Sequence, residues 1–136
     1  MTYLSDHRAG LRADPSHLLS NVQSIICVGI LYNTPAPLTV QDEPYRGWIS
    51  RYAWGDDYHD LLRARLRQLA ERMSAAYGDF DYPVCVDTSA LLERPYARRP
   101  GLGWLGKNTG ITIQEIGSTF FLGEWLTPLR LAPHRP

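Results

Sequence analysis

Apolar and polar positions divide the first third of the chain into three parts. Residues 24–32 form an apolar run rich in β-branched side chains, which is typical of a short buried strand. Residues 1–19 are more polar, with helical patches that are expected to stop at Asp14 and Pro15. Residues 33–46 contain three prolines and are predicted to form a loop.

The strongest periodic signal predicts a helix over residues 58–77. Its predicted apolar face consists of Leu62, Leu66, Leu69, Met73 and Ala76. The charged residues on the other face are interpreted as a solvated surface. Asp56 or Asp57 can cap the start of this helix, and Gly78 can end it.

Shorter elements are expected in the second half of the chain. They are a strand at 80–86, a helix at 90–98, a glycine-rich loop at 101–108, a hairpin of 110–114 with 118–122, and a tail at 126–136. Strands and helices do not alternate regularly. This order favours the α+β class, or a mixed sheet flanked by helices.

The composition is that of an ordinary globular domain. The chain has 136 residues, which suits one domain, with 44% hydrophobic residues, 21% charged residues and no formal net charge. Lys107 is the only lysine among 14 basic residues, so arginine dominates. Arginine suits phosphate contacts, but GC-rich codon usage explains the same bias. No apolar run is long enough for a membrane span, and a cytoplasmic location is expected.

The two cysteines, Cys27 and Cys85, lie in separate apolar runs and do not form a C-x-x-C pair. Free, buried thiols are therefore expected. The chain alone cannot supply the four thiolates that a 4Fe-4S cluster usually takes.

The loop at 101–108, GLGWLGKN, matches the dinucleotide fingerprint and nearly matches a phosphate-binding loop. Both arrangements need a helix after the loop, whereas a strand-like segment follows here, and Asn108 replaces the required hydroxyl residue. Nucleotide binding is thus a weak alternative. The glycines allow a tight turn from which Trp104 and Lys107 project, unless Trp104 fills the core.

Two acid–base candidates emerge from the pattern. Asp87 follows an apolar segment, where desolvation would favour its protonated form and suit a general acid; it could instead cap the next helix. His59 could be an acid or a ligand, or a structural residue near a helix start. Simpler interpretations also exist for Arg94, as an ion pair with Glu93 or Asp87, and for Arg12, as a surface charge.

Five segments occur in an order that resembles one known family. They are 51–59 (RYAWGDDYH), 86–94 (VDTSALLER), 101–108 (GLGWLGKN), 117–124 (GSTFFLGE) and 11–15 (LRADP). Together they resemble epoxyqueuosine reductases. One departure is Pro100, where the family normally has alanine, so the entry to the glycine loop is expected to differ slightly.

The resemblance implies an α+β fold with a mixed, mainly antiparallel sheet and flanking helices, similar to nitroreductases and cobalamin-dependent reductive dehalogenases. It also implies that residues 1–136 are a single, partial cobalamin-binding catalytic domain. The family's 4Fe-4S ferredoxin-like and helical-repeat domains would then lie outside this chain. The isolated fragment is expected to have little or no activity.

The implied reaction is the cobalamin-dependent reduction of epoxyqueuosine to queuosine in tRNA, with Asp87 as proton donor. The implied partners are a tRNA carrying the queuosine precursor at its anticodon and an external electron donor, without a membrane. No protein ligand is expected on the reactive face of the cobalamin, so His59 is not assigned to cobalt. The implied cofactor-binding residues are Arg12, Arg51, Tyr52, Tyr58, His59, Asp87, Arg94, Lys107, Ile111 and Leu122. The alternative is a non-catalytic fragment that binds a corrinoid or a protein partner.

Overall fold

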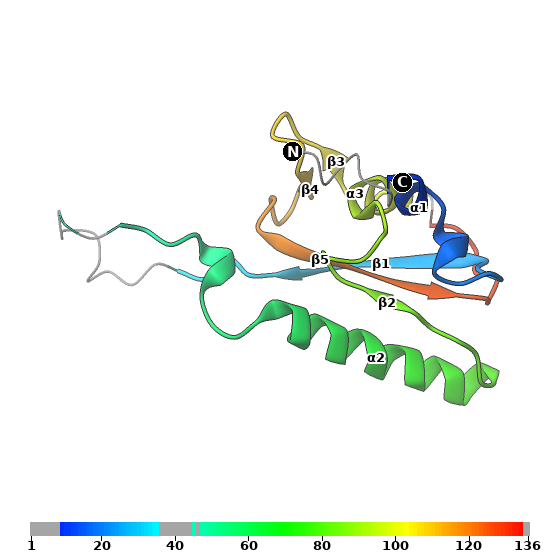
Figure 1. Cartoon of the computed structure of the whole chain (residues 1–136). Helices are drawn as coiled ribbons and strands as arrows, with labels where there is room; N and C mark the ends of the chain where they lie inside the picture. Colours follow the sequence, from blue (N-terminus) through cyan, green and yellow to red (C-terminus); the bar gives the residue numbers. More distant parts are fainter. Residues whose placement is uncertain (1–8, 36–44, 46, 135–136) are drawn as a thin grey trace.

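A three-stranded antiparallel sheet forms the centre of the molecule (Figure 1). The computed structural model describes residues 9–35, 45 and 47–134. Strand β5 (Phe120–Thr127) lies between β1 (Ser24–Leu31) and β2 (Val84–Cys85). The prediction of a strand at 24–32 is confirmed.

Strands β1 and β5 pair along their whole length, from Ser24 opposite Thr127 to Leu31 opposite Phe120. The prediction of a tail from residue 126 is therefore wrong at its start, because Leu126 and Thr127 belong to β5 and are fully buried. The predicted strand at 80–86 is reduced to the two residues of β2, since only Val84 and Cys85 pair with β5.

Helix α2 (Tyr58–Tyr77) lies along one face of this sheet, in the range that the periodicity predicted (Figure 1). Asp57 caps it by accepting a hydrogen bond from the backbone N–H of His59, and Gly78 ends it. Its buried residues are Leu62, Leu66 and Ala70.

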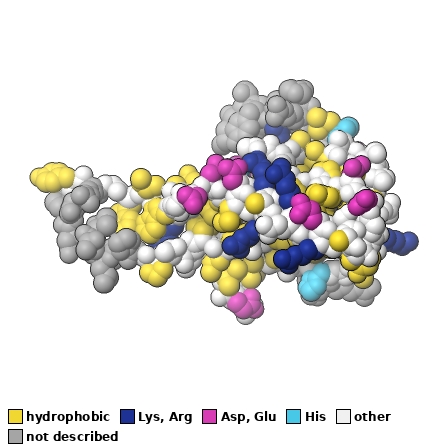
Figure 2. Space-filling view, turned by 90° about the horizontal axis from the view of Figure 1, so that it is seen from below, with side chains coloured by type: hydrophobic (Ala, Val, Ile, Leu, Met, Phe, Trp, Pro, Cys, Tyr) yellow, Lys and Arg dark blue, Asp and Glu magenta, His cyan; other side chains and the backbone are white. Residues whose placement is uncertain are grey.

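The predicted apolar face of α2 is partly wrong, because Leu69 is 38% exposed and Ala76 is exposed. Neither residue belongs to the core cluster that contains the fully buried Trp125 and Val86. Figure 2 looks onto the molecule from the α2 side and shows basic and acidic side chains interspersed. The prediction of a solvated, charged outer face is thus confirmed.

The opposite face of the sheet is covered by α1 (Ala9–Ala13), the 3-10 turn η2 (Pro15–His17) and α3 (Glu93–Arg98) (Figure 1). A second core lies here and contains Leu19, Cys85, Leu91 and Leu126. Helix α3 begins later than the predicted start at residue 90. Both cysteines are free thiols, as predicted, with Cys85 buried and Cys27 half-buried.

The pairing of the predicted hairpin is wrong. Strand β4 (Ile111–Thr112) pairs with β3 (Trp104–Leu105) in a separate two-stranded sheet, and only an isolated bridge joins Ile113 to Gly117. Residues 120–122 of the predicted hairpin belong instead to β5, the central strand of the main sheet. Strand β4 therefore pairs with β3, which lies inside the glycine-rich loop.

The architecture is therefore α+β with an antiparallel main sheet, as expected. The 3-10 turn η4 (Arg51–Ala53) leads into α2. Most of the predicted loop at 33–46 and part of the predicted N-terminal segment lie outside the described residues. Within the described part of the chain, no helix is long and apolar enough to cross a membrane.

Candidate functional site

A cavity of about 360 Å³ opens where the start of β5, the start of α2, the turn after β2 and the loop after β3 meet. Apolar side chains and a few polar groups share its surface. It is lined by Tyr32, Tyr58, Asp87, Glu93, Arg94, Asn108, Gly110, Ile111, Ser118, Thr119, Phe120, Phe121 and Leu122. This volume and this mixture are typical of small-molecule sites.

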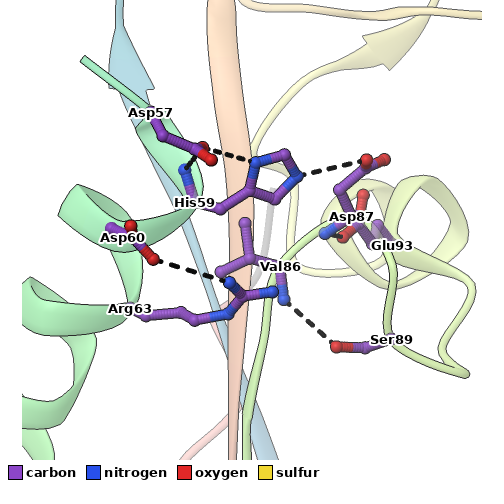
Figure 3. Close-up of polar contacts among 8 residues, drawn as sticks. All are labelled: Asp57, His59, Asp60, Arg63, Val86, Asp87, Ser89 and Glu93. Carbon is purple, nitrogen blue, oxygen red and sulfur yellow. Dashed lines mark hydrogen bonds and ion pairs between the residues drawn. The ribbon is translucent and has the colours of Figure 1, made fainter.

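Asp87 lies in the turn after β2 and lines the cavity. Its backbone has the left-handed value φ 50°, and its N–H donates to Oε1 of Glu93. Its carboxylate lies 3.3 Å from Nε2 of His59 (Figure 3). The turn directs this side chain outward, so that it is 60% exposed.

Two expectations for Asp87 need correction. The predicted desolvation at the end of an apolar strand is wrong for this chain, since the carboxylate is largely exposed. The alternative role as a helix cap is also wrong, because the residue at the N-cap of α3 is Leu92. Asp87 instead belongs to a polar cluster that it forms with His59 and Glu93.

His59 bridges two carboxylates. Its Nδ1 lies 2.7 Å from Oδ1 of Asp57, and its Nε2 faces Asp87 (Figure 3). Burial alone would lower the pKa of His59, but the hydrogen bonds to Asp57 and Asp87 outweigh it and raise that pKa. A protonated imidazole can donate to both acids at once, and this arrangement orients Asp87.

An aromatic stack supports this cluster. The ring of Tyr58 lies 4.0 Å from the imidazole of His59 and 3.9 Å from the ring of Phe121, measured between centroids. The ring of Tyr32 also contacts Phe121, with centroids 4.4 Å apart. Burial, together with nearby carboxylates, raises the pKa of Tyr58 to about 12, so its hydroxyl stays protonated at neutral pH.

Two further acids, Glu93 and Glu124, were not predicted as site residues. Burial raises the pKa of both, that of Glu124 to about 9. Glu124 is fully buried in the central strand β5. One signal could have found it, because Glu124 is the only charged residue within an otherwise uncharged segment, GSTFFLGEWLT.

Several predicted cofactor contacts converge on the cavity. Arg94, Ile111 and Leu122 line it together with Tyr58 and Asp87. The guanidinium of Arg94 donates to the hydroxyl of Thr109 at 3.1 Å, a partner that the sequence did not indicate.

Other predicted contacts lie outside the residues that line the cavity. The guanidinium of Arg51 donates to the side-chain oxygen of Asn33, and Tyr52 is 54% exposed in η4. Arg12 lies in α1, where its carbonyl accepts the N–H of Leu92. Lys107 is exposed in the turn between β3 and β4.

The glycine-rich loop forms the turn of the β3–β4 pair, in which Gly106 donates to the carbonyl of Gly110. A strand follows this loop, where a phosphate-binding loop needs a helix, so the loop does not have the architecture that the nucleotide alternative requires. Trp104 is 51% exposed and projects from the loop rather than filling the core. Among the described residues, no group of three His, Cys, Asp or Glu side chains is arranged to hold a metal ion.

Comparisons with known proteins agree with this fold. The chain is 41% identical to an epoxyqueuosine reductase of Salmonella typhimurium; the match covers the whole chain but 36% of the relative's length. It is similar to the solved epoxyqueuosine reductase of Streptococcus thermophilus, with a TM-score of 0.83 and 30% identity over 99% of this chain and 41% of that one. It also resembles an epoxyqueuosine reductase solved with an epoxyqueuosine-modified tRNA stem loop, with a TM-score of 0.79 and 34% identity over 92% of this chain and 34% of that one.

The sequence pattern of one family, described as epoxyqueuosine reductase QueG, DUF1730, matches residues 12–88. This match covers more than half of the chain and includes Tyr58, His59 and Asp87. The chain belongs to the epoxyqueuosine reductase family.

Proposed function

We propose that this chain is the cobalamin-binding catalytic part of an enzyme that reduces epoxyqueuosine to queuosine in tRNA, with Asp87 as the proton donor. The observation that carries this proposal is the position of Asp87 at a cavity of about 360 Å³, held by Glu93 and His59. Family membership and the relative solved with a modified tRNA stem loop support the substrate class.

The cavity suits one face of a corrin. Ile111, Phe120 and Leu122 offer an apolar surface for a flat macrocycle, while Arg94 and Asn108 offer donors to polar side groups. A corrin is larger than the cavity, which would therefore hold only part of it. When bound, cobalamin would supply the two-electron reduction chemistry.

The role of the protein is then to deliver a proton and to shape the site. Protonated His59 would orient the carboxyl of Asp87 and supply it with a proton through the contact at 3.3 Å, and Asp87 would pass this proton to the oxygen that leaves the opening epoxide. Tyr58 remains a neutral hydroxyl, because burial raises its pKa to about 12. Arg12, Arg51, Tyr52 and Lys107 would contact parts of the cofactor or the tRNA outside the cavity.

The same proposal includes the partners of the enzyme, its location and its source of electrons. The partners are a tRNA bearing the queuosine precursor and an external electron donor, in the cytoplasm. Residues 1–136 would form one partial domain of the nitroreductase-like type. The electrons would arrive through 4Fe-4S clusters that this chain does not itself ligate.

The test is the substitution Asp87→Asn in the complete natural protein, which is supplied with cobalamin and a chemical reductant. Turnover of an epoxyqueuosine-modified stem loop should fall by about 100-fold or more, since a positioned acid contributes roughly that factor. Cobalamin binding, measured by its visible absorbance, should be unchanged. Asp81→Asn is the matched control, since Asp81 is an exposed aspartate outside this cavity, and it should leave turnover intact.

Full activity of the Asp87→Asn protein would refute the role of Asp87. A wild-type protein that binds cobalamin but never turns over would instead support a non-catalytic, corrinoid-binding function.

A further inference from the structure

Three side chains form a row across the sheet beneath α3. In the register of the strands, Glu124 of β5 is the Cα partner of both Cys27 in β1 and Cys85 in β2. Cys85 and Leu126 pack in the core on the α3 side, and alternation along β5 places Glu124 on that side as well. A carboxyl group therefore lies between two thiols in the middle of the sheet.

Glu124 has no compensating partner among the described residues. Its side chain is fully buried, and neither carboxyl oxygen has a hydrogen-bond partner there. An ionised carboxylate in such a place would carry a large desolvation cost. Burial, followed by the negative charge of Glu93, raises the pKa of Glu124 to about 9.

The two thiols beside Glu124, those of Cys27 and Cys85, stay uncharged near neutral pH. Burial raises the pKa of Cys27 to about 12 and that of Cys85 to about 11. Both are therefore neutral neighbours. Glu124 is left as a neutral carboxylic acid close to Glu93.

Glu93 occupies a different environment, although burial also raises its pKa. Its Oε1 accepts the N–H of Asp87, which favours the ionised form. The ionisable groups facing it are Asp87 from the turn, His59 and Tyr58 from α2, Glu124 from β5, Arg94 from its own helix, and the two thiols. The negative charge of Asp87 adds to the effect of burial on the pKa of Glu93, whereas Arg94 and His59 lower that pKa.

We propose that Glu93 is a positioning residue for Asp87: its carboxylate holds the backbone of the Asp87 turn, while Glu124 beneath it remains a neutral acid. This inference rests on the proposed function for its importance in turnover, but not for its geometry. One negative charge between the two glutamates gives a charge-assisted hydrogen bond to Asp87 N–H, which is stronger than a neutral one. A second charge would be repelled by the first.

The first test reads the turn directly by NMR. Amide proton shifts of the 15N-labelled chain are followed from pH 4 to pH 8 in the Asp87→Asn background, which removes the residue's own side-chain titration. The amide at position 87 should show a transition with a midpoint above the ordinary glutamate value of 4.5, because the pKa of Glu93 is raised. Adding Glu93→Gln, which keeps the size and an acceptor, should abolish that transition, while a separate step that follows the titration of the nearby His59 ring remains.

Glu124→Gln is the matched variant, since glutamine imitates a neutral acid. It should leave the transition and its midpoint in place. Persistence of the transition with Glu93→Gln, or a lowered midpoint with Glu124→Gln, would overturn the proposal. Unchanged amide shifts elsewhere in the chain check that each variant is folded.

A second measurement needs no substitution. In wild-type chain labelled with 13C at glutamate carboxyls, Glu124 should keep the shift of a protonated acid up to pH 8, whereas Glu93 should be ionised at pH 7. An ionised Glu124 or a neutral Glu93 at pH 7 would contradict the assignment even if the variants do not fold.

Turnover then separates this inference from the proposed function. Glu93→Gln should lower kcat by about 10-fold to 100-fold, as expected for a misplaced acid, with little change in KM. If the wild-type protein does not reduce epoxyqueuosine, the proposed function fails, while the titrations still decide whether Glu93 holds the turn. Unchanged kcat in an active enzyme would overturn the positioning role.

Discussion

The charge of His59 depends on two acids that are distant from each other in sequence. Asp57 caps α2, whereas Asp87 comes from the turn after β2, and the imidazole lies between them. Because both contacts favour the protonated ring, the pKa of His59 is raised despite burial. The two contacts of protonated His59 stabilise the folded state. Their contribution to the free energy of unfolding is fully present below pH 6.5 and is lost as pH rises through the raised pKa of His59 in the folded state.

This pairing predicts how the ring of His59 titrates. Its NMR midpoint should lie above 6.5 in the wild-type chain and fall toward the ordinary value with Asp87→Asn, because one favourable carboxylate is removed. Asp60→Asn is the control, since Asp60 is exposed and pairs with Arg63. An unchanged His59 midpoint in the Asp87→Asn variant, or an equal shift in the Asp60→Asn variant, would contradict the interpretation that His59 bridges Asp57 and Asp87.

Sequence reasoning selected Asp87, His59 and Tyr58 as candidates but did not select the half-buried Glu93 or the fully buried Glu124. The motifs indicated single residues near a site. The environment of Glu124 depends on which residues of β1 and β2 lie opposite it, and no local pattern specifies that register. The exposure of Asp87 was mispredicted for a similar reason, because a turn with positive φ redirects its side chain.

At the scale of elements, helix α2 lies unusually close to the central strand at one glycine. A Cβ added to Gly123 would lie 2.8 Å from Cδ2 of Leu62 and 3.0 Å from Cδ1 of Leu66. Both leucines are buried side chains of the main core and have little room to move. The absence of a side chain at Gly123 therefore fixes how closely α2 approaches β5.

Gly123→Ala should destabilise the fold by about 1–3 kcal/mol, the typical cost of overpacking a core. Chemical denaturation with a tryptophan fluorescence readout measures this change. Gly47→Ala is the matched control, because an added Cβ there meets nothing within 4 Å. Equal stability of the two variants would show that α2 shifts away from β5 at little cost.

The elements differ in how well the sequence predicted them. Helix α2 was correct in extent because its period and both caps are local signals. Strands β2, β4 and β5 were correct mainly in position, whereas β3 was not predicted and lies in the expected glycine-rich loop. Their lengths and partners depend on tertiary pairing, so the expected hairpin was replaced by the β3–β4 pair.

For the whole molecule, the order β1-β5-β2 makes β5 the strand with partners on both sides. The two-residue strands β3 and β4 form a separate, small sheet with only two residue pairs, so we expect it to open more readily than the main one, although Ile111 of β4 packs against Phe120 of β5. The α+β class was predictable from the irregular order of elements. The central place of β5, near the end of the described chain, was not, because it depends on pairing between segments far apart in sequence.

Hydrogen exchange should follow this division. The interior amides of β5 that bond to β1 should exchange roughly 100-fold or more slowly than those of β3 and β4, a difference of about 3 kcal/mol in opening free energy. Mass spectrometry of deuterium uptake in short peptides gives the comparison. Similar rates in both sheets would mean that the two open as a single unit.

The left-handed backbone at Asp87 also determines which substitution is informative there. Asparagine adopts φ near 50° more readily than most other side chains, so it retains the local path of the chain while removing the exchangeable acid proton. Alanine at the same place would bring conformational strain as well as lost acidity. Loss of activity with Asp87→Ala could therefore come either from the altered backbone or from the missing acid. Asp87→Asn keeps the backbone path, so a loss of activity in that variant reports on the acid alone.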